Sequence, residues 1–450
     1  MSGDRALPPG PRWPPLVQSV ALLRFRHRFV PALRVRHGPV FTVRTLPRAR
    51  RLVLFTAPEE ARDIFAGDPD TFHGGEANAI LRPVLGEHSL LLTDSAEHAR
   101  ARRLLMPAFN GAALRGYEPL VREVAAEQVV RWPVGVPFRS LDRMSALTLE
   151  VILRVVLGVS DETRLARLRP LVDRTVRVGP AVLLGREHPL LRRLGPWRAA
   201  RETQRALEDV LDAEVRARRR PQRRVGRDDV LSRLLRVDDD GERLGDDELR
   251  DHLVTLLLAG HETTATALSW TLFELGRDPG QLARAQRAAR DGDADHLRAV
   301  LQESMRLHPV IPMVVRHLTR PARVGGVDLP PGVDVGPSIL LMHSSGRLHR
   351  EPGRFRPERF LQGEVAPHTW IPFGGGVRRC IGAGFSLMEG AAVLREVLTR
   401  YDVRAVDPGR ERAMVRNITS VPRLGARIVV RPLVPDGGPA PEPVGPCRGR

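Results

Sequence analysis

The chain has 450 residues, with 71 basic and 53 acidic residues and a formal net charge of +18. All of the basic residues are arginines, spread along the whole chain, and aromatic residues make up only 4%. Because no basic patch is interleaved with stacking aromatics, we expect no nucleic-acid partner. The two cysteines, Cys380 and Cys447, are too few for a disulfide framework and favour a reducing, cytoplasmic setting. No stretch stays apolar for long enough to span a membrane, so we expect no transmembrane segment.

Taken in chain order, the sequence predicts a mainly α fold with a minor β portion. Clustered prolines predict an extended lead over residues 1–16, and β-rich residues 40–55 predict a hairpin. Helical periodicity then dominates to about Pro309. The expected helices cover residues 117–132, 144–157, 197–219, 247–276 and 280–307, followed by a strand at 324–329, a helix at 381–401 and a strand at 428–433. We therefore expect one domain over residues 17–433 and a disordered tail over 434–450, in which Cys447 is an exposed thiol.

Residues 373–382, with the sequence F-G-G-G-V-R-R-C-I-G, form the most informative segment. Cys380 precedes an apolar, helix-like run, where unpaired N–H groups and the helix dipole favour a thiolate. Gly376 permits a tight turn before the sulfur, and Gly382 lets a bulky group approach the backbone. No general base is evident beside the cysteine, so the pattern favours a metal ligand over a nucleophile. The alternative is a buried structural cysteine in a glycine-rich turn.

A second unusual segment, L-L-L-A-G-H-E-T-T at residues 256–264, lies inside the predicted helix 247–276. Glycine in a helix interior costs about 1 kcal/mol relative to alanine, and threonine can divert backbone hydrogen bonds. An acid beside an alcohol, Glu262 and Thr263, suits proton delivery. We interpret the segment as a local widening of the helix at a reaction site. The alternatives are a capped break between two helices and, for Glu262, a salt-bridged surface residue.

Three weaker patterns accompany these two. Glu303 and Arg306 share one helical face at a spacing of i, i+3, and Arg359 lies in the segment F-R-P-E-R-F at residues 355–360. His98 and Arg102 share a helical face at i, i+4. Taken alone, none of these patterns identifies one kind of functional site.

In order and spacing, the motifs resemble those of the cytochrome P450 haem-thiolate monooxygenases over roughly residues 8–433. The resemblance implies a triangular helical prism that holds haem b between a long distal helix and the cysteine loop with its helix. It implies Cys380 as the axial iron ligand, shielded by Phe373 and followed by Gly382. It implies Glu262 and Thr263 as catalytic residues, and a buried triad that locks the haem-binding loop, formed by Glu303, Arg306 and Arg359. The haem propionates would be bound by His98, Arg102, Arg316 and Arg378.

The resemblance also implies a substrate and partners. Residues 76–92, 180–197, 256–259, 310–315 and 418–421 would surround the pocket, with Leu258, Ala259, Val310, Val314 and Ile418 as lining candidates. Their apolar character predicts a hydrophobic small molecule, such as a terpenoid, fatty acid or polyketide, hydroxylated or epoxidised with dioxygen in natural-product biosynthesis. The two electrons would come from a separate acidic ferredoxin and its reductase. Candidate docking residues are Arg100, Arg103 and Arg379.

Three other functions stay open. A haem-thiolate peroxygenase or isomerase would not need to activate dioxygen, which intact Glu262 and Thr263 argue against. A non-enzymatic haem sensor would bind the same cofactor without turnover. An arginine-rich nucleic-acid binder would show DNA affinity that falls steeply with salt and would be purified without haem.

Overall fold

The computed structural model describes residues 7–433 except 47–48, 180–181, 183–193, 221, 223–225 and 238–240. The expected tail at 434–450, with Cys447, lies outside the described residues, as does most of the expected pocket segment 180–197. Helices dominate, with a smaller β portion, as the sequence predicts. The helices are α1 (Pro15–His37), α2 (Pro58–Ala66), α3 (Gly74–Ala77), α4 (Arg82–Leu85), α5 (Ser95–Leu105), α6 (Gly111–Val129), α7 (Ser140–Leu157), α8 (Glu162–Val176), α10 (Gly195–Arg219), α11 (Val230–Leu234), α12 (Asp246–Arg277), α13 (Pro279–Asp291), α14 (Ala294–Leu307), α15 (Ile339–His343), α16 (Glu358–Leu361) and α17 (Ala383–Leu398), with short 3₁₀ turns η1 (Ala79–Leu81), η2 (Met106–Ala108) and η5 (Gly376–Arg378).

Four small sheets make up the β portion. The largest has the strand order β1-β2-β8-β5-β3, and its strands β1 and β2 form the predicted antiparallel hairpin, with Phe41 opposite Leu54. The others are β4-β12-β9, β10-β11 and β6-β7. The strands are β1 (Phe41–Thr45), β2 (Arg50–Phe55), β3 (Phe72–His73), β4 (Phe138–Arg139), β5 (Arg316–Leu318), β6 (Ala322–Val324), β7 (Val327–Leu329), β8 (Asp334–Pro337), β9 (Tyr401–Ala405), β10 (Ala413–Arg416), β11 (Thr419–Pro422) and β12 (Arg427–Pro432).

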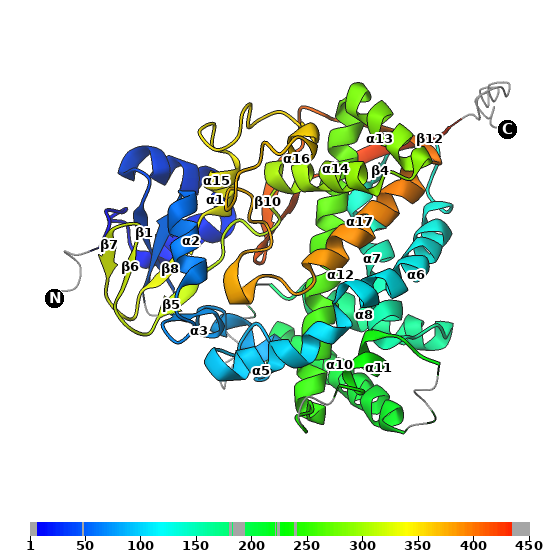
Figure 1. Cartoon of the computed structure of the whole chain (residues 1–450), viewed down its shortest axis with the longest axis horizontal. Coiled ribbons are helices and arrows are strands. Elements are labelled where there is room, and N and C mark those ends of the chain that lie inside the picture. The colour runs from blue at the N-terminus through cyan, green and yellow to red at the C-terminus, as the bar shows by residue number, and fades with distance from the viewer. Residues whose placement is uncertain are drawn as a thin grey trace.

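The largest sheet, with α1, α2 and α15 beside it, occupies one side of the molecule, and most of the other helices occupy the opposite side (Figure 1). Helix α12 runs through the helical side and is buried along most of its length, because it packs on α7 and on the strands near the carboxyl end. Helix α17 lies beside α12, and the two are joined by a hydrogen bond of 3.2 Å between the hydroxyls of Thr264 and Ser386. The two helices therefore lie in direct contact on the helical side of the molecule.

Two elements that the sequence predicts as continuous are each divided in two, and other helix ends differ by up to six residues, as in α6. The expected helix 280–307 is two helices, α13 and α14, because Gly292 adopts a positive φ of 76° and Asp293 caps the second helix through the N–H of His296. The expected strand at 324–329 is instead the hairpin β6-β7, since Gly325 and Gly326 form a turn with positive φ. In both places glycine permits the left-handed backbone that ends the element.

Candidate functional site

The cysteine loop is held by its own backbone and by α2. The N–H of Cys380 donates to the carbonyl of Phe373 at 2.9 Å, and the N–H of Arg379 donates to Gly376 at 3.0 Å. Gly376 has a φ of 65°, and a Cβ there would lie 1.9 Å from the carbonyl oxygen of Phe65. Only glycine satisfies both the turn and the close approach of α2. The loop therefore presents Cys380 at a fixed place ahead of α17.

The Cys380 sulfur is accessible to solvent and yet surrounded by protein. Its side chain is exposed, while burial raises the pKa of its thiol against the opposing effects of the Gly382 N–H and the Arg102 charge. The side chain is therefore reached by solvent although protein atoms surround it closely. A Cβ at Gly382 would meet no atom nearer than this sulfur, at 4.0 Å, so the backbone leaves open space beside the sulfur.

Two effects act on the pKa of this thiol in opposite directions. The helix N-terminus favours a thiolate, but desolvation has the larger effect and raises the pKa. At neutral pH the thiol of the protein alone is therefore protonated, and a metal cation is needed to deprotonate it. Binding of iron at Cys380 should accordingly release a proton.

One face of α12 is accessible in the middle of a buried helix. Leu256, Ala259, Gly260 and Thr263 are all partly or fully exposed, whereas most residues from Asp251 to Leu275 are buried. Their spacing of i, i+3, i+4, i+7 places them on one side of the helix. This face is apolar apart from the hydroxyl of Thr263, which donates to the carbonyl of Ala259 at 2.8 Å.

The helix is continuous from Asp246 to Arg277, so the alternative of a capped break between two helices is wrong. Gly260 has a packing reason as well, since a Cβ there would lie 2.8 Å from the side chain of Ile152 on α7. The expected widening does not interrupt the helix.

Glu262 does not share this accessible face. It is 8% exposed, and its Oε1 accepts a hydrogen bond of 2.6 Å from Nε of Arg416 on β10. Burial raises the pKa of the carboxyl, while Arg416 and the hydroxyl of Thr419 oppose that shift. The alternative of a salt-bridged surface residue is therefore correct about the salt bridge and wrong about the position, because Glu262 is buried. Sequence analysis gave no role to Arg416.

Four basic side chains meet beside the cysteine loop, on α5, β5 and η5. His98, Arg316 and Arg378 line one small pocket. Burial lowers the pKa of Arg316 to about 10 and that of His98 to about 4, and it lowers the pKa of Arg102 as well. Within the described residues, only Arg378 of the four forms an ion pair, with Asp94 at 2.6 Å.

Arg316 is 8% exposed, and its Nη1 donates to the neighbouring carbonyl of Val315 at 3.0 Å. A buried guanidinium without a counter-ion is costly. This cluster is therefore suited to bind the carboxylates of a cofactor, and the residues present fit haem.

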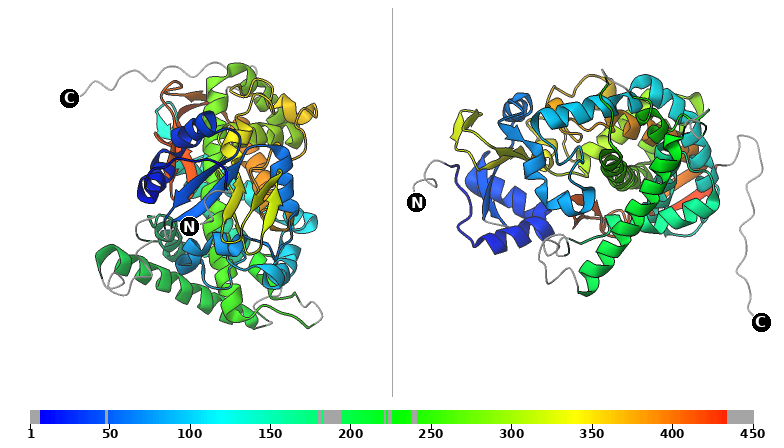
Figure 2. Two further views of the ribbon diagram at one scale, coloured as in Figure 1. Left: turned by 90° about the vertical axis from the view of Figure 1, so that its left-hand side faces the viewer. Right: turned by 90° about the horizontal axis from the view of Figure 1, so that it is seen from below.

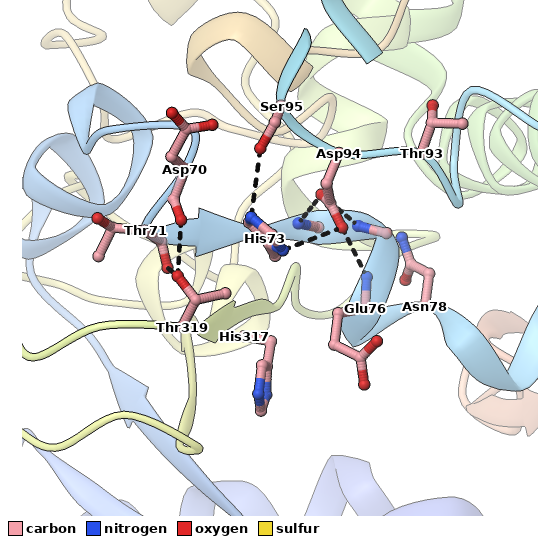
Figure 3. Close-up of polar contacts among 12 residues, drawn as sticks. Asp70, Thr71, His73, Glu76, Asn78, Thr93, Asp94, Ser95, His317 and Thr319 are labelled. Atoms are coloured by element: carbon pink, nitrogen blue, oxygen red, sulfur yellow. Dashed lines mark hydrogen bonds and ion pairs between the residues drawn. The ribbon is translucent and has the colours of Figure 1, made fainter. Parts of the chain in front are cut away.

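Asp94 is a second residue to which the sequence patterns assign no role, and Figure 3 shows its contacts. Its Oδ1 accepts the N–H groups of Gly74 and Gly75 at 2.8 Å, and its Oδ2 accepts that of Glu76 at 2.9 Å. The same carboxylate binds Nη2 of Arg378. By sequence, Asp94 reads only as an N-cap of the following helix, but its side chain makes no capping bond there. It joins the segment around α3 to the cysteine loop instead.

The structure brings together Glu303, Arg306 and Arg359. Both Glu303 oxygens accept from Arg306, at 2.8 and 2.9 Å, and both accept from Nε of Arg359, at 3.0 and 3.1 Å. Arg306 also donates to the carbonyls of three distant residues, His343, Pro352 and Arg354. Side-chain exposures are 0% for Glu303 and Arg306 and 2% for Arg359. The cluster thus ties α14 to the long irregular segment that precedes the cysteine loop.

The five pocket candidates lie on three parts of the chain. Leu258 and Ala259 are accessible on α12. Val310 is 8% exposed and accepts the N–H of Ser420, beside the β10-β11 turn where Ile418 is 49% exposed. Val314 lies beside the cysteine loop, 3.8 Å from where a Cβ on Gly374 would sit.

The three candidate docking residues differ in whether their side chains already bind an acidic group of the same chain. Arg100 donates to Glu248 at 2.7 Å and Arg103 to Glu242 at 2.6 Å, so both already bind acidic groups of the same chain. Arg379 is exposed. Of the three candidates, we therefore expect Arg379 to be the one available to a redox partner.

The comparisons with known proteins agree with this geometry. A family model described as Cytochrome P450 matches residues 8–425. The chain is 50% identical over 434 residues to "Putative cytochrome P450 135A1" of Mycobacterium tuberculosis, covering 96% of this chain and 97% of that protein. It is 42% identical over 440 residues to "Putative cytochrome P450 135B1" of Mycobacterium bovis, covering 96% and 93%.

Two solved structures share the fold, each at 24% identity and a TM-score of 0.84. The first is the retinoic acid-bound cyanobacterial CYP120A1, and the match covers 95% of this chain and 99% of CYP120A1. The second is the cytochrome P450DA haem domain, and the match covers 96% of this chain and 99% of that domain. Among the described residues, no helix has the length and apolar character of a membrane span.

Proposed function

The chain belongs to the cytochrome P450 family, a family of haem b monooxygenases, and from that premise we propose that it oxidises a hydrophobic small molecule bound against the accessible face of α12. The observation that carries the proposal is the apolar character of this face, formed by Leu256, Ala259 and Gly260 with the single hydroxyl of Thr263. Such a surface selects substrates by apolar burial and offers few polar anchors. Terpenoids, fatty acids and polyketides are the classes that fit.

We further propose the residues that hold the cofactor. Cys380 binds the iron, Phe373 shields the sulfur, and Gly382 leaves the space in which the ring lies. The propionates are bound by His98, Arg102, Arg316 and Arg378. Haem bound in this way supplies the iron chemistry that activates dioxygen, because a thiolate ligand donates the electron density that favours O–O cleavage.

The protein's own part in the reaction is proton supply and exclusion of water. Thr263 offers the hydroxyl on the accessible face, next to bound substrate. Glu262 is the nearest acid in sequence, and its raised pKa keeps a proton available closer to neutral pH. Glu262 lies on a different face of α12 from Thr263 and is bound by Arg416, so proton delivery from this acid requires that contact to open.

The family requires dioxygen and an electron donor, and we propose an acidic ferredoxin with its reductase as that donor. The exposed guanidinium of Arg379, directly before Cys380, provides a positive charge for docking. A role in natural-product biosynthesis suits a substrate of this kind.

Binding spectra test the substrate class. The haem-loaded protein is titrated with terpenoids, fatty acids and macrolides, and with sugars as polar controls, and the Soret shift is followed. Saturable shifts for the lipophilic classes alone support the proposal. Shifts for the sugars alone would overturn it, and turnover with peroxide but not with dioxygen and a reduced ferredoxin would favour a peroxygenase.

Replacing Thr263 with alanine is expected to uncouple electron use from product formation. Thr263 is the only hydroxyl among the four residues of the accessible α12 face, so its loss removes the proton donor beside the substrate. Product formed per NADPH should fall by about one to two orders of magnitude, and hydrogen peroxide should rise. The matched control is Thr266→Ala, which removes an equivalent bond of 2.8 Å to the Glu262 carbonyl on the buried side of the same helix. Equal uncoupling in both variants would refute a specific role for Thr263.

Replacing Asp94 with asparagine is expected to loosen both segments that it joins. The variant loses the ion pair to Arg378 and the charged acceptor for three backbone N–H groups, and bonds to charged groups contribute about 1.5–3 kcal/mol. Haem transfer to apomyoglobin should accelerate by roughly tenfold or more, and hydrogen exchange at Gly74 to Glu76 should rise. Asp70→Asn changes an exposed carboxylate in the same region and should alter neither rate. Unchanged exchange at Gly74 to Glu76 in the Asp94 variant would contradict the assignment.

A further inference from the structure

The first half of α1 exposes an unusual number of large apolar side chains. Trp13, Leu16, Val17, Val20 and Leu23, here called the outer α1 face, are each 41–60% exposed. Their spacing places them on one side of the helix and the turn before it. Helix α1 lies on the outside of the molecule, beside the strands of the largest sheet (Figure 2). Single exposed apolar residues are ordinary, but a contiguous set indicates a binding surface.

The opposite side of this half-helix is polar. Its buried residues are Gln18, Ser19 and Arg26, whereas the apolar buried residues of α1 begin only at Phe29. Gln18 accepts the N–H of Arg44 at 2.8 Å, Ser19 accepts that of Leu46 at 2.8 Å, and Arg26 donates to the carbonyls of Asn417 and Ile418. This half of the helix is thus fixed by these polar contacts together with Ala21 and Leu22, which pack partly buried against the core, while the outer α1 face points to solvent.

The chain segment that carries the outer α1 face contains basic residues and no acidic ones. The chain contains 53 acidic residues, yet none occurs from Arg5 to Pro58. Arg12, Arg24 and Arg28 are exposed beside the apolar residues. An apolar strip flanked by arginines matches a surface with negative groups outside and hydrocarbon beneath.

We propose that the outer α1 face docks the protein on an anionic phospholipid bilayer, with the apolar side chains among the acyl chains and the arginines at the headgroups. A second copy of the chain fits less well, because pairing the two faces would bring Arg24 and Arg28 against like charges. An acidic protein partner would match the arginines but leaves the apolar strip unexplained. The docking is peripheral, and it does not depend on which substrate the pocket accepts.

Vesicle sedimentation tests this inference on the full, haem-loaded chain. We expect binding to vesicles of phosphatidylcholine and phosphatidylglycerol in equal parts, little binding to phosphatidylcholine alone, and release by high salt. The double variant Leu16→Asp with Val20→Asp should bind about tenfold more weakly. Reversal of the flanking charges, Arg24→Glu with Arg28→Glu, should abolish the preference for the anionic vesicles.

Matched controls separate the surface from general effects. Val130→Asp with Leu361→Asp changes two apolar residues that are 66% and 48% exposed elsewhere, and it should leave binding unchanged. Arg115→Glu with Arg205→Glu controls for net charge, since both arginines are exposed on other helices. An unchanged spectrum of the reduced protein with carbon monoxide confirms that each variant is folded.

Three results would overturn the inference. The first is no binding to anionic vesicles, and the second is binding that the Leu16 and Val20 variant does not weaken. The third is a dimer by light scattering that this variant dissociates in the absence of any vesicle binding, which would assign the face to a second copy.

Discussion

Replacing Cys380 with alanine should abolish monooxygenase turnover and the red-shifted absorption that a thiolate-ligated haem gives when reduced in carbon monoxide. The sulfur is the proposed protein ligand to the iron, and its side chain is accessible to solvent, with open space beside it at Gly382. Without the thiolate, no group at this position donates electron density to the iron. Activity with dioxygen and reduced ferredoxin should fall below detection. Haem affinity should also decrease, measured by transfer to apomyoglobin.

Cys447→Ala provides the matched control, because it removes the other cysteine of the chain and should leave spectrum and turnover unchanged. A pH measurement adds an independent readout. Since burial keeps the thiol protonated in the protein alone, haem binding should release one proton more in the parent than in the Cys380→Ala variant. Retention of the red-shifted absorption in Cys380→Ala would refute the assignment of the ligand.

Patterns that are local in the sequence predicted their structures well. The apolar periodicity of residues 247–276 gave a helix within one residue of α12, and the alternation in 40–55 gave the β1-β2 hairpin. Haem and the monooxygenase class followed from the resemblance of the cysteine loop and the A-G-H-E-T-T segment to the motifs of a known family, each of which lies within one loop or one helix. Such patterns can be read without tertiary information because neighbouring residues define them.

Contacts between distant segments could not be predicted in this way. Asp94 and Arg378 are 284 residues apart, and Glu262 and Arg416 are 154 apart, so no local pattern connects them. Glu262 and Thr263 are neighbours in sequence, yet a helical turn of about 100° per residue directs their side chains to different faces, so their joint role in proton supply stays a prediction. The break at Gly292 was missed because an isolated glycine in a helical pattern is often tolerated. Burial, which raises the pKa of the Cys380 thiol, is likewise a property of the fold and not of a local pattern.

Glu303→Gln should destabilise the protein more than any other single charge removal proposed here. The glutamate is the common partner of Arg306 and Arg359, and the three side chains are at most 2% exposed. Removing the carboxylate leaves two buried guanidiniums without a counter-ion, for which the cost is about 3–5 kcal/mol. Because Arg306 also holds the carbonyls of Pro352 and Arg354, the loss should spread into the segment that leads to the cysteine loop. Urea unfolding of the haem-loaded protein measures the free energy of unfolding directly.

The matched control for this prediction is Glu351→Gln, which removes the same charge from an exposed pair with Arg354 at 2.8 Å. Water already solvates both partners there, so the change in the free energy of unfolding should be far smaller. Arg306→Lys distinguishes charge from geometry, because lysine keeps the charge but cannot bind both Glu303 oxygens while also donating to three carbonyls. It should therefore destabilise the protein nearly as much as Glu303→Gln does. Equal unfolding midpoints for the Glu303 and Glu351 variants would instead show that the buried cluster does not stabilise the loop, and fixation of Cys380 would then rest on the glycine turn and α2 alone.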